Sequence, residues 1–97
     1  VVKKISHKKD IILPNVGFHK PIQLSQNKNS YNENDWFYFV HSFKCVPKNK
    51  KNISSVIKYE GIDIVSSLKK ENVSGCQFHP EKSHDAGINY FKNFINE

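Results

Sequence analysis

Residues 36–40 read Trp-Phe-Tyr-Phe-Val, and this is the strongest β-strand signal in the sequence. Aromatic and β-branched residues favour strands, and here they occupy both alternating faces. Because apolar side chains on both faces require cover on both sides, the stretch predicts a strand inside a layered domain. The pattern continues through His41 to Phe43, so we expect the strand to include these residues.

The sequence around this strand predicts several more. Alternating or β-rich patterns occupy residues 1–6, 18–24, 53–59, 62–68 and 73–79. Glu60 and Gly61 predict a hairpin turn between two of these runs. Pro21 lacks an N–H, so its run is expected to be an edge strand or to carry a bulge.

One helix is expected near the end of the chain. Apolar residues recur there at helical spacing, at Ile88, Phe91 and Ile95. They predict an amphipathic helix from about residue 84 to residue 95, with Ser83 as a candidate N-cap. Gly87 lowers helix propensity, which close packing against a neighbour would explain.

The composition limits the class of protein. A chain of 97 residues, 37% of them hydrophobic, holds one domain at most. We expect no membrane span and no signal peptide, because no apolar run approaches about 20 residues. The two cysteines have no zinc or redox spacing, so a reduced, cytoplasmic setting is expected. The strand pattern is already under way at Val1, and one helix covers little sheet, so we expect a piece of a longer chain.

The positive charge is weak evidence for nucleic-acid binding. The formal net charge is +6, and all 15 basic residues are lysine. Lysine is poorer than arginine at bidentate phosphate and base recognition, and no nucleic-acid-binding motif accompanies it. Solvated lysine-rich loops are the preferred interpretation, although a small basic domain that binds a polyanion stays open as an alternative.

The clearest chemistry lies in the tripeptide His79-Pro80-Glu81. Side chains alternate along a strand, so Cys76 and Phe78 are expected on one face and His79 on the other. Pro80 keeps His79 out of helical conformation, and Glu81 can return to accept a hydrogen bond from the imidazole. Such a carboxylate sets the tautomer of a general base and stabilises its charged form. The tripeptide alone equally fits a loop in which the histidine packs and the glutamate faces water.

The longer string favours the site over the loop. Residues 75–83, Gly-Cys-Gln-Phe-His-Pro-Glu-Lys-Ser, resemble the Gly-x-Gln-Phe-His-Pro-Glu-Lys-Ser signature of class I glutamine amidotransferases. Three other segments agree in order, namely residues 13–18, 38–43 and 59–61. Within the family, the sequence is most similar to the glutaminase subunits of imidazole glycerol phosphate synthase, a histidine-pathway enzyme.

The resemblance implies an α/β, flavodoxin-like domain, of which residues 1–97 form the C-terminal, strand-rich half with one C-terminal helix. It implies a Cys-His-Glu triad in which His79 and Glu81 are catalytic. The backbone at Ser42 and Phe43 matches the segment that helps to hold the substrate glutamine. No cofactor is expected. Five histidines without paired spacing give no metal pattern, so no metal is expected either.

The resemblance also implies a protein partner. Tyr38, Lys82 and Phe18 match positions that face a cyclase subunit, a (β/α)8 barrel that receives the ammonia in a heterodimer. Asn15, Phe18 and His19 stand where the histidine-pathway subunits tend to carry His, Trp and Asn. A paralogous amidotransferase of surface-sugar biosynthesis therefore remains an alternative.

The nucleophile of the triad is not expected in this sequence. In the family it lies in a Gly-x-Cys-x-Gly-x-Gln segment that precedes the matched segments. Cys45 and Cys76 have different surroundings and are interpreted as small packed residues. The nucleophile-bearing N-terminal part is thus expected to be absent and the chain alone to be inactive, and a degenerate amidotransferase half without chemistry also stays open.

Overall fold

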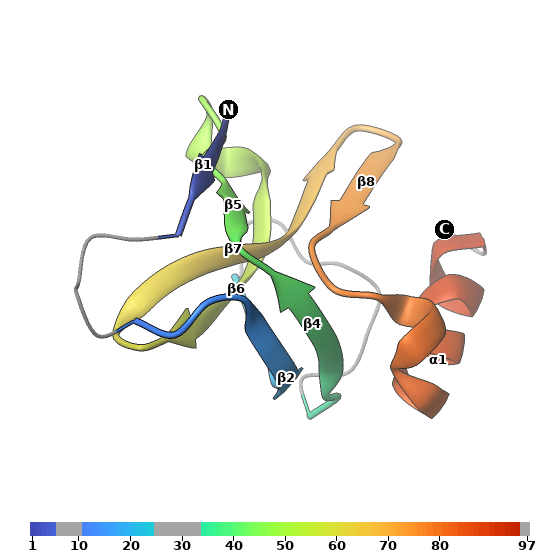
Figure 1. The fold of residues 1–97 in the computed structure, drawn as a ribbon. Coiled ribbons are helices and arrows are strands. Elements are labelled where there is room, and N and C mark those ends of the chain that lie inside the picture. The colour runs from blue at the N-terminus through green and yellow to red at the C-terminus, as the bar shows by residue number, and fades with distance from the viewer. Residues whose placement is uncertain (6–10, 25–33, 96–97) are drawn as a thin grey trace.

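The computed structural model describes residues 1–5, 11–24 and 34–95 (Figure 1). The strands are β1 (Val2–Lys4), β2 (Asn15–His19), β3 (Ile22–Gln23), β4 (Phe37–His41), β5 (Phe43–Cys45), β6 (Ile53–Tyr59), β7 (Ile62–Lys70) and β8 (Val73–Cys76). Two 3-10 turns, η1 (Lys50–Asn52) and η2 (Pro80–Lys82), precede β6 and the C-terminal helix α1 (His84–Ile95).

The strands form three antiparallel sheets within the described residues. The largest has the order β3-β6-β7-β8, and two-stranded sheets pair β2 with β4 and β1 with β5. The β6–β7 hairpin turns at Glu60 and Gly61, both with positive φ, as the Glu-Gly pair predicted. The architecture is strand-rich with one C-terminal helix, as expected from the sequence.

Two of the strands predicted in the first 24 residues differ from those observed. Residues 18–24 do not form one strand, because the chain changes sheets at Pro21. On one side of Pro21, β2 pairs with β4, and on the other side β3 pairs with β6 at the edge of the largest sheet. The strand predicted over residues 1–6 is shorter, and its last residue lies outside the described residues.

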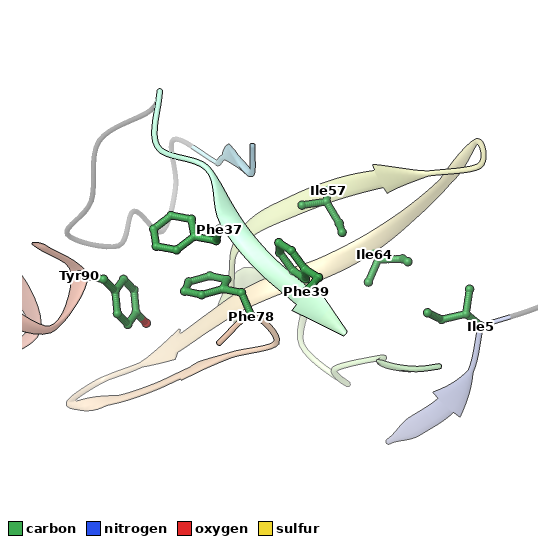
Figure 2. Packing of buried hydrophobic residues seen from close by; sticks show 7 residues of the cluster. All are labelled: Ile5, Phe37, Phe39, Ile57, Ile64, Phe78 and Tyr90. Atoms are coloured by element: carbon green, nitrogen blue, oxygen red, sulfur yellow. The ribbon is translucent and has the colours of Figure 1, made fainter. Parts of the chain in front are cut away.

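The core lies against one face of β4. Figure 2 shows the cluster, whose buried members are Ile5, Phe37, Phe39, Ile57, Ile64, Phe78 and Tyr90. Phe37 and Phe39 lie on the same face of β4, and the ring of Phe78 stacks on Phe37 with centroids 4.1 Å apart. Several aromatic rings thus pack together from β4, α1 and the segment after β8.

Within the described residues, only one face of this strand is covered, although its sequence predicts cover on both faces. Trp36 lies outside β4 and is exposed, as is Val40, while Tyr38 is half-buried. The strand also stops at His41, because Ser42 forms a bend from which β5 leaves to pair with β1. Strand propensity could not locate that bend, since it depends on which strands are available for pairing.

The helix α1 has the expected bounds but buries an unexpected face. Its buried residues are Gly87 and Tyr90, whereas Ile88, Phe91 and Ile95 are exposed. An apolar stripe thus remains uncovered within the described part of the chain. None of the helices described is both long and apolar enough to span a membrane.

A cluster of serines lies buried between β6 and β7. Its members are Ser54, Ser55, Ser66 and Ser67. The Ser55 hydroxyl hydrogen-bonds to the hydroxyls of Ser66 and Ser67. The Ser54 hydroxyl has no hydrogen-bond partner among the described residues. Two adjacent residues of β6 therefore carry buried hydroxyls, of which, in the part of the chain that the structure describes, Ser55 is hydrogen-bonded and Ser54 is not.

We expect Ser55→Ala to lower the free energy of unfolding by about 1–2 kcal/mol, because it leaves two buried hydroxyls short of a partner. Ser54→Ala is the matched control and is expected to be neutral or stabilising by up to about 1 kcal/mol, because it removes an unpaired polar group. Urea unfolding at equal m-value measures both. Equal losses for the two variants would contradict the assignment.

Candidate active site

The strand β4 holds the chain that follows β8. The Gln77 N–H donates to Ser66 O on β7 (2.8 Å), and two residues later the His79 N–H donates to Tyr38 O on β4 (2.9 Å). The chain therefore crosses from one sheet to another between these residues. The predicted strand over residues 73–79 is accordingly too long, since β8 ends at Cys76 and His79 belongs to the next segment.

The turn η2 returns the chain toward His79. His79 is extended, with φ −102° and ψ 97°, which agrees with the restriction imposed by Pro80. The His79 carbonyl accepts the Lys82 N–H at 3.0 Å, and the Pro80 carbonyl accepts the Ser83 N–H at 3.1 Å. This tight turn brings Glu81 back beside the imidazole, as the sequence predicted.

His79 and Glu81 form a hydrogen-bonded pair. The imidazole Nδ1 lies 2.9 Å from a carboxylate oxygen of Glu81, and the two side chains are 38% and 57% exposed. The pKa of Glu81 is lowered, first by its own backbone N–H and then by the hydrogen bond from His79. The imidazole is thus oriented by a carboxylate and open to solvent, and it is not sealed in the core.

Because side chains alternate along the extended chain before Pro80, Phe78 and Cys76 lie on the face opposite His79. Phe78 is buried in the core cluster, and Cys76 packs against that cluster. Burial raises the pKa of the Cys76 thiol to about 11, so the thiol is protonated at neutral pH. Its Sγ contacts the Phe78 carbonyl at 3.4 Å. Cys76 is therefore a packed residue and a poor nucleophile.

Ser83 has a larger role than the sequence indicated. Its hydroxyl donates to the His79 carbonyl (2.6 Å) and accepts the Tyr38 N–H (2.9 Å). The candidate N-cap thus ties the His79 segment to β4, and the residue is buried. Sequence alone could not separate these roles, because serine favours both caps and local backbone bonds.

Gly87 explains how α1 approaches the turn. A Cβ at this position would lie 1.8 Å from the Pro80 carbonyl oxygen. The glycine therefore permits close packing of the helix on the segment that carries His79 and Glu81. The expectation of close packing at Gly87 is confirmed.

The predicted substrate residues Ser42 and Phe43 lie where β4 passes into β5. Ser42 forms the bend, and Phe43 is the first residue of β5. The Ser42 carbonyl accepts the Ile5 N–H at 2.8 Å, and the Phe43 carbonyl accepts a hydrogen bond from His41 Nδ1 at 2.8 Å. The pKa of His41 is lowered by burial and by the nearby His79, although its bond to Phe43 opposes this. The bend is thus joined to His41 at the C-terminal end of β4, and the His79 segment is joined to Tyr38 in the same strand.

The predicted partner residues are partly brought together. Phe18 meets Tyr38 edge to face with centroids 5.3 Å apart and stacks on His84 at 5.9 Å. Phe18 remains exposed, while Tyr38 is half-buried. Lys82 is exposed on η2. An aromatic surface and a lysine thus flank the turn that carries the His–Glu pair.

A polar cluster that no sequence pattern predicts lies around Asn15. This fully buried side chain hydrogen-bonds to His19 at 2.8 Å and to His41 at 3.1 Å. Asn15 and His19 had drawn notice only as departures from the family pattern. Within the described residues, no group of three or more His, Cys, Asp or Glu side chains is placed to hold a metal ion.

The fold and the paired residues define a class of protein. The sequence matches the class I glutamine amidotransferase family over residues 3–97, and the chain belongs to this family. Among its relatives, imidazole glycerol phosphate synthase subunit HisH 2 of Methanococcus maripaludis is 42% identical over 96 residues, which cover 97% of this chain and 46% of the relative.

Two further relatives carry the same enzyme name. Imidazole glycerol phosphate synthase subunit hisH of Cyanophora paradoxa is 32% identical over 100 residues, covering 99% of this chain and 46% of the relative. The corresponding subunit of Prochlorococcus marinus subsp. pastoris is 35% identical over 98 residues, covering 97% and 47%. The chain spans about half the length of the curated relatives it matches.

Gly87→Ala should lower the free energy of unfolding by about 2–3 kcal/mol, because the added methyl group overlaps the Pro80 carbonyl. Asn89→Ala, on the exposed side of α1, is the control and is expected to stay within about 0.5 kcal/mol. Chemical denaturation measures both. A harmless Gly87→Ala would show that the helix does not pack on η2.

The carboxyl pKa of Glu81, followed by NMR titration, should rise in His79→Ala but stay below its ordinary value, because the backbone N–H still favours the charged form. Since folding lowers this pKa, the pair stabilises the protein above the unfolded-state pKa, and that contribution is lost as pH falls through the folded-state pKa. His84→Ala, which leaves the pair intact, is the control. An unchanged Glu81 pKa in His79→Ala would refute the pairing in solution.

Proposed function

We propose that this chain supplies the His–Glu part of a glutaminase site, and that the whole protein transfers ammonia from glutamine to a synthase partner. The observation that carries the proposal is the exposed His79–Glu81 pair, 2.9 Å apart, within the family's most specific string. The carboxylate orients Nδ1 and stabilises the imidazolium, so Nε2 is the ring nitrogen that remains to exchange a proton.

The proposed reaction is hydrolysis of the glutamine side-chain amide. A cysteine thiol gives its proton to His79, and the thiolate attacks the amide carbon. The C–N bond then breaks, and His79 returns the proton to the leaving nitrogen, which departs as ammonia. Water, deprotonated by the same imidazole, hydrolyses the thioester to glutamate and restores the thiol. Glu81 orients His79 throughout and bonds to no substrate atom.

The nucleophile in this proposal comes from outside residues 1–97. Cys76 is unsuitable, because it packs on the core face and its pKa is raised to about 11. Residues 1–97 then form the C-terminal part of one amidotransferase domain. The exposed apolar stripe of α1, with Ile88 and Phe91, is consistent with further domain structure against this helix.

The bend at Ser42 and Phe43 is the proposed place for part of the glutamine. Both of its carbonyl groups are already bonded, to Ile5 and to His41, so the backbone there is held in one conformation. A backbone held in advance binds a ligand with less loss of entropy. The bend lies at the end of β4, the strand that also holds the His79 segment.

The proposed partner is a cyclase subunit with a (β/α)8 barrel. Phe18 and Tyr38 offer an aromatic surface, and Lys82 offers a positive charge beside it. Aromatic and positively charged groups of this kind are common anchors in protein interfaces. The relatives are named as subunits of imidazole glycerol phosphate synthase, which favours the histidine pathway over surface-sugar biosynthesis.

The alternative of a polyanion-binding module has less support. That alternative treats the His-Pro-Glu tripeptide as incidental and expects its side chains to diverge. The imidazole and the carboxylate instead converge, and the turn between them is supported by Ser83 and Gly87. Such support is expected for a constructed site and is not needed for a solvated loop.

The test joins this chain to the nucleophile-bearing segment of the Methanococcus maripaludis relative and measures glutamate release. The joined protein should release glutamate, and the 97-residue chain alone should not. His79→Ala should lower turnover by about 10³-fold and Glu81→Gln by a smaller factor, because the first removes the general base and the second only its orientation.

Lys50→Ala, an exposed change on η1, is the control and should leave turnover unchanged. Full turnover by the joined His79→Ala protein would overturn the proposed mechanism. Turnover by the chain alone that is lost on Cys76→Ser would overturn the assignment of the nucleophile to another segment.

A further inference from the structure

Three polar side chains form a continuous line from β2 to the Ser42–Phe43 bend. His19 Nε2 lies 2.8 Å from Asn15 Oδ1, and Asn15 Nδ2 lies 3.1 Å from His41 Nε2. His41 Nδ1 in turn lies 2.8 Å from the carbonyl oxygen of Phe43. The line therefore ends on the backbone of the predicted glutamine-binding segment.

The chemistry of these atoms allows one direction of donation in this arrangement. A carbonyl oxygen only accepts, so His41 Nδ1 must carry a proton and donate it to Phe43. The Asn15 amide nitrogen only donates, so His41 Nε2 must be unprotonated and accept from it. Asn15 Oδ1 only accepts, so His19 Nε2 carries a proton. The three bonds thus run from His19 to Asn15 to His41 to Phe43.

The surroundings favour this arrangement. Asn15 is fully buried, so an unpaired amide there would be costly. Burial lowers the pKa of both His19 and His41, which favours the neutral rings that the line requires. Among the described residues, the titratable neighbours of this line include the two rings themselves, His79 after β8 and the ring of Tyr59 on β6.

We propose that the His19–Asn15–His41 relay is a positioning device that holds the carbonyl of Phe43 and so fixes the bend that receives glutamine. The inference rests on the proposed function for the identity of the ligand, but the relay itself does not. Its members are positioning residues, because they act on the bend through His41 and touch no reacting atom. The Ile5 N–H holds the adjacent Ser42 carbonyl, so the two anchors act together on one bend.

The first test reads the ring nitrogens of the 97-residue chain by NMR. At pH 7, His41 should be protonated at Nδ1 and bare at Nε2, and His19 should be protonated at Nε2. Asn15→Asp replaces the donating amide with an acceptor, so His41 should then carry protons on both nitrogens at pH 7. Asn49→Asp makes the same change at the residue before η1 and should leave His41 neutral. A neutral His41 protonated at Nε2 in the unchanged chain would overturn the relay.

The second test follows the bend in the same chain. Asn15→Ala should speed hydrogen exchange of the Ile5 amide by about tenfold. The reason is that the Ile5 N–H donates to the Ser42 carbonyl, and the bend loosens when Asn15 no longer supports it. Asn49→Ala should not change it. If Asn15→Ala fails to fold, His19→Gln, which weakens only the first bond, replaces it with a smaller expected increase. Unchanged exchange in a folded variant would overturn the positioning role.

The third test uses the protein joined to the nucleophile-bearing segment. Asn15→Ala and His19→Gln should raise KM for glutamine by up to about tenfold with little change in kcat, because they weaken the support of the Phe43 carbonyl and leave the chemical groups in place. Release of glutamate with an unchanged KM in both variants would overturn this inference alone. No release from the unchanged joined protein would overturn the proposed function, while the first two tests would still decide the relay.

Discussion

Two hydrogen bonds at Tyr38 are the constraint on which the rest of the site depends. The Tyr38 carbonyl accepts the His79 N–H, and the Tyr38 N–H donates to the Ser83 hydroxyl. The strand β4 thereby holds both ends of the short turn that carries the His–Glu pair. Because Ser83 also donates to the His79 carbonyl, the turn is closed on itself as well as on the strand. Rigid backbone support of this kind is what keeps a catalytic pair in one geometry.

The segment that carries Phe78 and His79 faces the core on one side and solvent on the other. Phe78 stacks on Phe37 in the core and anchors the segment there, while His79, one residue later, stays open to solvent. The alternation of an extended chain permits both, and it also keeps the Cys76 thiol away from the imidazole. On the far side, Gly87 lets α1 pack directly on the Pro80 carbonyl. The pair is therefore exposed, while the residues that hold its segment, Phe78, Ser83 and Gly87, are buried.

β4 also links this pair to the proposed substrate segment. Its C-terminal residue, His41, binds the Phe43 carbonyl, while Tyr38 binds the His79 segment. Substitutions along β4 are therefore expected to alter the positions of both the His79 imidazole and the Ser42–Phe43 bend. The chain covers about half of its relatives' length, and the exposed stripe of α1 shows that its apolar surface is only partly used by the described residues. When the parts of a site come from segments far apart in the sequence, one strand that contacts several of them holds them near each other.

Features that depend on neighbouring residues could be predicted from the amino-acid sequence. These include the Glu60–Gly61 turn, the helix, the extended conformation imposed on His79 by Pro80, and family membership through one specific string. The bend at Ser42, the exposed stripe of the helix, the second role of Ser83 and the hydrogen bonds of Asn15 became visible only in the folded chain. The physical reason is that periodicity and φ restrictions act over a few positions. The hydrogen-bond partner of a polar group depends instead on the path of the whole chain between the two residues. Tyr38 and Ser83, for example, are 45 positions apart in the sequence.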